Sequence, residues 1–139
     1  NRLGFSEVIR ERLSLDAFLP APGQGALAIQ TRENDADAAW TRALNHDLTA
    51  LAVAAERGAM AALEGSCRTA IGAYAHIEDG RLRLSTEMLS PDGAGRWTRS
   101  GDIAAPADLT DVDAAAARAL GLDLGGQVHA VAGDQKIAL

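Results

Sequence analysis

The sequence predicts an α+β domain over residues 46–139, with a three-stranded antiparallel sheet packed by helices. Three changes of pattern support this. Apolar residues recur at helical spacing from Leu48 to Leu63, alternate with polar residues from Ile71, and return to helical spacing after Thr110. Because the faces of helices and strands repeat at different periods, each change marks a new element. The order of helix, three strands and helix is that of a small α+β unit.

The first helix of this unit has start and stop signals as well as an apolar face. Asn45, His46 and Asp47 offer side chains that cap a helix N-terminus. Gly65 is placed to end the helix, and Gly58 within it costs about 1 kcal/mol relative to alanine. The apolar face is formed by Leu48, Leu51, Ala52, Ala55, Ala59, Ala62 and Leu63. We therefore predict a long helix that runs to Leu63.

The sheet is predicted from a change of the apolar period to two. Residues 71–77 and 82–88 fit the strands of a hairpin, because Asp79-Gly80 between them is typical of a two-residue turn. A third strand over residues 96–103 follows a turn at Pro91-Asp92-Gly93. One face of the second strand carries Leu82, Leu84, Thr86 and Met88.

A last helix is expected after the sheet. Thr110 suits its N-cap, and helical spacing extends to Leu120 or Leu124. Gly125-Gly126 is expected to break it, since glycine is unfavourable inside a helix. Aromatic residues make up only 4% of the chain, so the core should consist mainly of leucine, isoleucine, valine and alanine.

Residues 1–45 do not complete a domain of their own. Apolar spacing indicates helix within residues 5–14 and 35–44, and a short buried strand over residues 26–31, with Leu27 and Ile29 on one face. A single strand cannot satisfy its ladder hydrogen bonds. We therefore expect this strand to insert into a sheet made by chain outside this sequence.

Composition narrows the class of protein. A net charge of -6 argues against nucleic acid or an anionic membrane surface as partner, because both favour a basic face. No apolar run is long enough to span a bilayer. The single cysteine excludes an internal disulfide and favours a reducing cytoplasm. No cluster of cysteine, histidine and acidic residues has metal-ligand spacing.

Cys67 is the residue with the most chemistry to offer, and three interpretations are open. A lone cysteine is commonly a small buried hydrophobe, although a Gly-Ser loop beside Arg68 is an unusual place for one. An activated thiolate nucleophile would need a base such as His46 or His76, and the preceding helix C-terminus opposes a negative charge. A cysteine that is alkylated once and stays a thioether needs no such activation.

A second candidate is the loop Gly23-Gln24-Gly25, which precedes the expected strand. It is either a tight turn or a place where a ligand approaches the backbone, with the Gln24 amide as a donor. It is not a phosphate-binding loop, because the lysine and the following helix are absent. Carboxylate ligands could pair with four arginines: Arg2, Arg32, Arg57 and Arg68.

Taken together, these segments resemble the porphobilinogen deaminase family. Residues 19–29 (LPAPGQGALAI) resemble its LPAxGQGAxxI segment, and residues 44–49 its LNHxxT segment. Residues 63–72 (LEGSCRTAIG) resemble its LEGGCxxP[IV][GA] segment, and Arg2-Leu3-Gly4 its RLG segment. The motifs occur in family order along essentially the whole chain. Departures are local, with Ser66 in place of a glycine the clearest of them.

The resemblance implies a transferase that joins four porphobilinogen units into hydroxymethylbilane, a linear tetrapyrrole, with release of ammonia. Cys67 would then be the covalent attachment point of a dipyrromethane cofactor, held as a thioether. Arg2 matches an arginine that binds carboxylates of cofactor or substrate. Gln24 and Gly25 match a segment that lines the active-site cleft.

The resemblance also implies that the chain is the C-terminal portion of a larger enzyme. Residues 1–18 would end domain 2, residues 19–45 would form a strand and helix returning to domain 1, and residues 46–139 would be domain 3. The preceding segment thus belongs to α/β N-terminal domains. The family's catalytic aspartate lies in the N-terminal part, so no catalytic residue is expected here.

Partners follow from the same resemblance. The expected ligands are porphobilinogen and the growing oligopyrrole chain, which is strongly anionic. A chain of net charge -6 cannot alone be their binding surface, so we expect it to be inactive without the N-terminal part of the enzyme. The complete enzyme is expected to be a cytoplasmic monomer. Two alternatives stay open: a cysteine-nucleophile enzyme and a non-catalytic α+β binding module.

Overall fold

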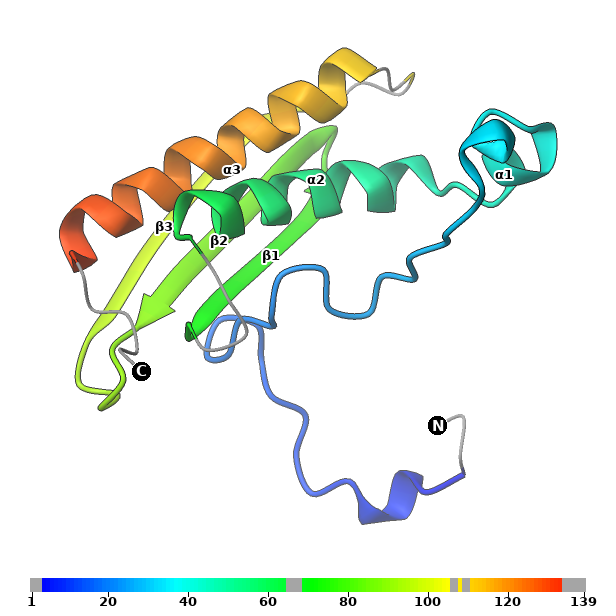
Figure 1. The fold of residues 1–139 in the computed structure, drawn as a ribbon. Helices are drawn as coiled ribbons and strands as arrows, with labels where there is room; N and C mark the ends of the chain where they lie inside the picture. Colours follow the sequence, from blue (N-terminus) through cyan, green and yellow to red (C-terminus); the bar gives the residue numbers. More distant parts are fainter. Residues whose placement is uncertain (1–3, 65–68, 106–107, 109–110, 134–139) are drawn as a thin grey trace.

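The computed structural model describes residues 4–64, 69–105, 108 and 111–133 of the 139. The long helices α2 and α3 and the strands β1 to β3 form its packed part (Figure 1). The elements in order are α2 (Asp47–Ala62), β1 (Ile71–Glu78), β2 (Arg81–Leu89), β3 (Arg96–Ala104) and α3 (Asp111–Ala132). This confirms the predicted α+β domain and its order of elements.

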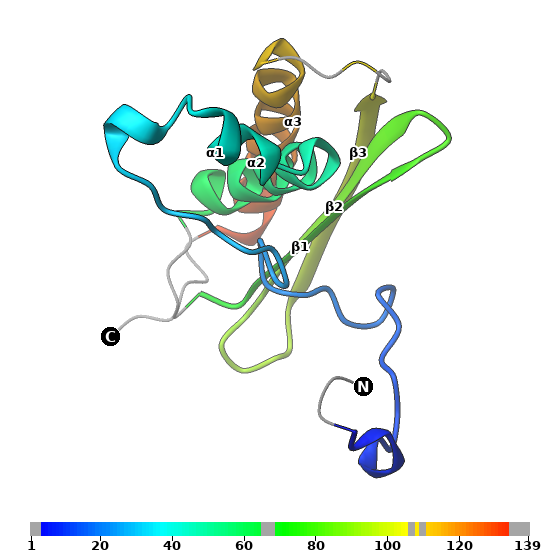
Figure 2. The same ribbon diagram turned by 90° about the vertical axis from the view of Figure 1, so that its right-hand side faces the viewer.

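The packed part has two layers, with α2 and α3 covering one face of the sheet (Figure 2). The strand order is β1-β2-β3, and both strand pairs are antiparallel. The predicted hairpin turn is confirmed, because Asp79 and Gly80 both have positive φ, at 51° and 69°. Positive φ at both positions is the mark of the type I′ turn that suits a two-residue hairpin.

Helix α2 begins at the predicted cap. The side chain of His46 accepts a hydrogen bond from the Thr49 N–H at 3.3 Å, and Asp47 in the first turn complements the helix dipole. The helix ends at Ala62, and Glu64 after it adopts a left-handed φ of 50°. The predicted stop, Gly65, lies outside the described residues.

The core lies between the helices and the sheet and consists largely of leucine and alanine, as composition predicted. The predicted face of β2 is confirmed, since its four side chains are at most 1% exposed. One cluster joins both helices to the sheet through Leu51, Ala55, Ala59, Ala73, Ala75, Leu82, Leu84, Ala105, Ala117 and Leu124. A second, at the end where α2 leads into β1, contains Leu63, Met88, Val128 and Ala132.

The predicted end of the last helix was wrong. Helix α3 runs through Gly125-Gly126 and ends only at Ala132. Gly125 is buried against α2, where an added Cβ would lie 2.7 Å from the carbonyl oxygen of Ala59. The glycine therefore serves the close approach of two helices rather than a break. The predicted cap, Thr110, lies outside the described residues.

Residues 4–46 differ from the predictions more strongly. The expected helix within residues 5–14 is reduced to a 3-10 turn at Ser6–Val8, and that within residues 35–44 to a 3-10 turn at Glu33–Asp35 followed by α1 (Ala39–Ala43). Residues 26–31 form no strand and are not buried; Leu27 is 93% exposed. The physical reason is that a strand needs a partner, and these residues have none in the described chain.

Candidate functional site

The loop Ala21–Ala26 is built from two overlapping tight turns. The Gln24 N–H donates to the Ala21 carbonyl at 3.0 Å, and the Ala26 N–H donates to the Gly23 carbonyl at 3.1 Å. Gly23 and Gly25 occupy the third positions of these turns, with φ of 75° and 85°. That position of a type II turn requires positive φ, which explains both glycines. Pro22 presets the first turn.

Open space lies beside both glycines. A Cβ added at Gly23 or Gly25 would meet no atom within 4 Å, so packing does not require them. The Gln24 side chain is exposed, and neither it nor the Gly25 N–H has a hydrogen-bond partner among the described residues. The loop therefore presents free donors beside space that a ligand can enter.

A hollow of about 440 Å³ adjoins this loop. Gln24 and Gly25 line one side of it, Thr49 on α2 a second, and Tyr74 and His76 on β1 a third. The rings of Tyr74 and His76 are stacked, with centroids 5.4 Å apart. The hollow thus combines an amide, a hydroxyl group and two aromatic faces between elements far apart in sequence.

The loop is held against the domain by one buried carboxylate. Glu56 on α2 is 7% exposed. Its Oε2 accepts from the Gly23 N–H at 2.6 Å, and its Oε1 accepts from the Ala75 N–H at 2.8 Å. Two residues earlier along the edge of β1, the Ala73 N–H donates to the Pro20 carbonyl at 2.9 Å. The edge strand is therefore covered by the loop and by Glu56.

We predict that Gly25→Ala loosens this loop. Alanine at a φ of 85° costs about 1 kcal/mol, although its methyl group meets nothing. The hydrogen exchange rate of the Ala26 amide should rise about fivefold, because 1.4 kcal/mol corresponds to tenfold. Gly25→Asn is the matched control and should have a smaller effect, since asparagine tolerates left-handed backbone better. An effect of asparagine that exceeds that of alanine would contradict the turn assignment.

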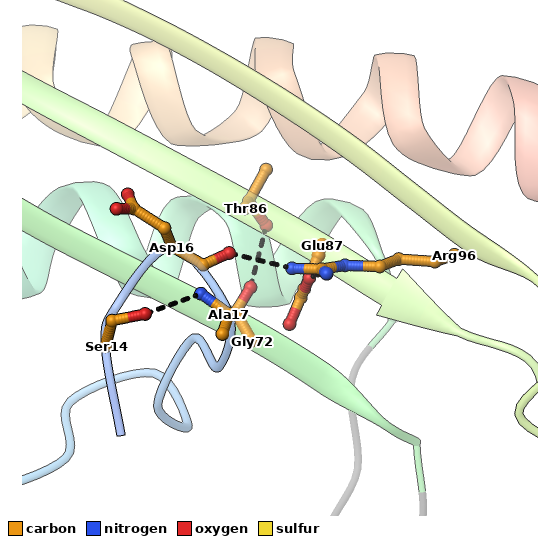
Figure 3. A network of polar contacts seen from close by, with 7 residues as sticks. All are labelled: Ser14, Asp16, Ala17, Gly72, Thr86, Glu87 and Arg96. Atoms are coloured by element: carbon orange, nitrogen blue, oxygen red, sulfur yellow. Dashed lines mark hydrogen bonds and ion pairs between the residues drawn. The ribbon is translucent and has the colours of Figure 1, made fainter. Parts of the chain in front are cut away.

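A second tie joins the preceding segment to the other face of the sheet (Figure 3). Arg96 on β3 pairs with the buried carboxylate of Glu87 on β2 at 2.7 Å and also donates to the Asp16 carbonyl at 3.4 Å. Leu19 packs over Gly72, where an added Cβ would lie 2.7 Å from the Leu19 Cβ. Residues 14–20 thus cross the face of the sheet that the helices leave open.

The connection that contains Cys67 starts and ends on fixed points. Leu63 before it is fully buried in the second core cluster. After it, the carbonyl of Ala70 accepts from the Leu89 N–H at 2.9 Å, which extends the pairing of β1 with β2. Cys67 itself lies outside the described residues, as does Arg2.

The geometry disfavours His46 as a base for Cys67. His46 and Leu63 flank opposite ends of α2, whose 16 residues make it about 24 Å long. Four residues of chain after Leu63 span at most about 14 Å. The His46 ring is also engaged in capping, with its Nδ1 2.8 Å from the Thr49 hydroxyl. His76 is placed on β1, stacked on Tyr74.

Glu56, the residue that brings loop, helix and strand together, was not among the predicted site residues. One signal was present: position 56 follows Ala52 by four, so the carboxylate falls beside the apolar face of α2. An acidic side chain there must find donors when the helix packs. Its partners, at sequence separations of 33 and 19 residues, could not be identified from spacing.

The described residues contain neither a candidate metal centre nor a candidate membrane-spanning helix. Among the described residues, no three or more histidine, cysteine or acidic side chains are grouped so as to hold a metal ion. None of the helices in the same part of the chain combines the length and the apolar character needed to cross a membrane.

Two protein-family models match the chain. One, described as the C-terminal domain of porphobilinogen deaminase, matches residues 50–129. The other, described as the "dipyromethane cofactor binding domain" of porphobilinogen deaminase, matches residues 1–40. The first match covers most of the packed domain, and the second covers the segment that contains the Gly23–Gly25 loop.

Individual relatives carry the same name. Porphobilinogen deaminase of Caulobacter vibrioides (strain NA1000 / CB15N) is 54% identical over 96% of this chain and 41% of its own length. That of Phenylobacterium zucineum (strain HLK1) is 50% identical over 96% of this chain and 41% of its own length. That of Ralstonia nicotianae (strain ATCC BAA-1114 / GMI1000) is 44% identical over 86% of this chain and 35% of its own length. The chain therefore spans less than half the length of these relatives.

Proposed function

Because the chain belongs to the porphobilinogen deaminase family, we propose that it is the cofactor-anchoring C-terminal part of a hydroxymethylbilane synthase. The complete enzyme would be a transferase of tetrapyrrole (haem and porphyrin) biosynthesis. It would join four porphobilinogen units head to tail and release ammonia at each addition. Cys67 would hold the dipyrromethane cofactor as a thioether.

The observation that carries this proposal is the anchoring of the Cys67 connection at both ends. Leu63 and Ala70, the residues described on either side of the connection, are held by the core and by the strand pairing. A group attached to the short chain between them would stay within reach of these two points, and an intramolecular reaction partner gains greatly in effective concentration. This suits a permanent tether better than a turnover nucleophile, for which the helix C-terminus is unfavourable.

The described residues also fit such a cofactor. The open space beside Gly23 and Gly25 admits a planar group close to the backbone. Gln24 and the Gly25 N–H can donate to its carboxylates, and Arg2 would pair with a carboxylate. The cofactor, when bound, supplies the nucleophilic pyrrole carbon of the addition. The protein residues bind its side chains and restrict its orientation.

The segment before the domain supports the proposed division of the enzyme. None of the described residues from 4 to 50 is buried. Large apolar side chains are exposed along this segment, at Phe5, Val8, Ile9, Leu13, Leu15, Phe18, Leu27, Ile29, Trp40, Leu44 and Leu48. We propose that residues 1–18 end domain 2 and residues 19–45 return to domain 1, where the N-terminal part of the enzyme covers them. Residues 46–139 would be domain 3.

The remaining features of the complete enzyme follow as proposals. The net charge of -6 supports an oligopyrrole-binding surface supplied mostly by the N-terminal part, so this chain alone would be inactive. That part would also hold the catalytic aspartate. A cytoplasmic location and a monomeric state stay predictions.

Intact mass of the full-length enzyme tests the proposal. The native protein should carry an increment of two pyrrole units, and peptide mapping should place it on Cys67. Protein denatured before addition of porphobilinogen is the control and should gain no further mass. A bare thiol at Cys67 in freshly purified, active full-length enzyme would contradict the proposal.

A further inference from the structure

Glu56 holds an unusual position for an acidic side chain. It is 7% exposed, and both of its carboxylate oxygens accept hydrogen bonds from backbone N–H groups. In the described part of the chain, no lysine, arginine or histidine forms an ion pair with it, although Arg57 is its neighbour in sequence. Burying a carboxylate is costly unless it is well satisfied. The two N–H groups, on separate elements, provide that satisfaction.

The two donors belong to regions that match different family models. Gly23 lies in the segment matched as cofactor-binding, and Ala75 lies in the C-terminal domain, as does Glu56 itself. At 2.6 Å and 2.8 Å, both contacts are short, as charge-assisted hydrogen bonds are. One side chain therefore sets the separation of the loop, α2 and β1.

Helix α2 carries this constraint toward the Cys67 connection. Glu56 precedes the last helical residue, Ala62, by six positions, which is about 9 Å along the axis. Gly58, two residues after Glu56, is closely packed against α3, where an added Cβ would lie 3.1 Å from the Leu122 nitrogen. Helix α2 cannot shift along its axis without disturbing the close packing of Gly58 against α3.

We infer that Glu56 is a positioning residue, which fixes the Gly23–Gly25 loop at a set distance from the helix that leads to the tethering cysteine. This inference rests on the proposed function. Glu56 also lines the hollow, but the role inferred here acts through the loop that its carboxylate holds. Each addition would depend on Glu56 because the loop would bind a group whose tether follows from this helix.

Glu56→Gln tests this inference in the full-length enzyme. Glutamine has one acceptor oxygen, so its NH₂ group must face one of the two N–H donors and that contact is lost. We expect kcat to fall about tenfold while KM changes less than about twofold, because a small displacement of aligned groups lowers rate more than affinity. The exchange rate of the amide that faces the NH₂ group, either that of Gly23 or that of Ala75, should rise at least about tenfold.

Glu87→Gln is the matched control. Glu87 is also a buried carboxylate, 5% exposed, but its partner is Arg96 on the outer face of the sheet. This variant should lower the unfolding temperature as much as Glu56→Gln does, without changing kcat or Gly23 exchange. Glu56→Asp keeps the charge on a shorter side chain and should give an intermediate kcat.

The outcomes separate the inference from the proposed function. If the wild-type enzyme carries no two-pyrrole increment, the proposed function fails. Unchanged exchange of both the Gly23 and the Ala75 amides in Glu56→Gln would independently overturn the inference. If the increment is present, equal kcat losses in Glu56→Gln and Glu87→Gln, or none in either, overturn the inference. Should Glu56→Gln not fold, a kcat for Glu56→Asp equal to that of the wild type overturns it.

Discussion

Full-length enzyme with Cys67→Ser is expected to carry no pyrrole increment and to form hydroxymethylbilane at least about 100-fold more slowly. Serine has nearly the shape of cysteine, so the fold of the domain should survive. Its hydroxyl is a far weaker nucleophile than a thiol, and a thioether cannot form. Without the tether, any primer must be recruited from solution, and the gain in effective concentration is lost. Intact mass and a product assay measure the two effects.

Ser66→Gly is the control for this experiment. It changes the preceding residue in the same connection but keeps the sulfur, and it introduces the residue that the family motif favours. This variant should load the cofactor fully and retain activity. Wild-type rates of product formation by Cys67→Ser would reject the tether, whatever the mass of the protein. Rapid alkylation of Cys67 in the wild-type enzyme would instead favour a cysteine-nucleophile enzyme.

The elements that could be predicted are those whose signals are local. A cap at His46 and an apolar face predict helix α2, and Asp79-Gly80 predicts the hairpin. The alternation along β2 identifies its buried face residue by residue. These patterns depend on neighbours in sequence, so no tertiary contact was needed to interpret them.

Contacts with distant chain could not be predicted from local patterns. Residues 26–31 have the pattern of a strand, but the described chain offers them no partner, so Leu27 stays exposed. Glu56 could be seen in the sequence, whereas its bonds to Gly23 and Ala75 could not. Cys67 and Arg2 were selected by motif and stay predictions, while Gln24 and Gly25 do lie together beside a hollow.

Glycine was the residue type most open to misinterpretation. The same residue ends a helix by adopting positive φ or lets two helices approach closely, and only the packing distinguishes these uses. In the crossing of α2 and α3, three glycines serve the second use: Gly58, Gly121 and Gly125. Residues 55 and 59 of α2 meet 121 and 125 of α3, so the two helices run in the same direction. Residues of both helices contribute to the main core cluster.

Gly121→Ala should therefore destabilise the domain by about 3 kcal/mol. Its methyl group would overlap the Ala55 carbonyl oxygen and lie 2.7 Å from the Ala59 nitrogen and 2.9 Å from the Gly58 Cα, all backbone atoms that cannot rotate away. Gly126→Ala, five residues along the same helix, is exposed with nothing within 4 Å, and should stabilise by about 1 kcal/mol through helix propensity. Native-state hydrogen exchange at the β2 amides of Leu82 and Leu84 measures the change in unfolding free energy in both variants. Changes of the same sign would show that propensity, and not the approach of the helices, governs these glycines.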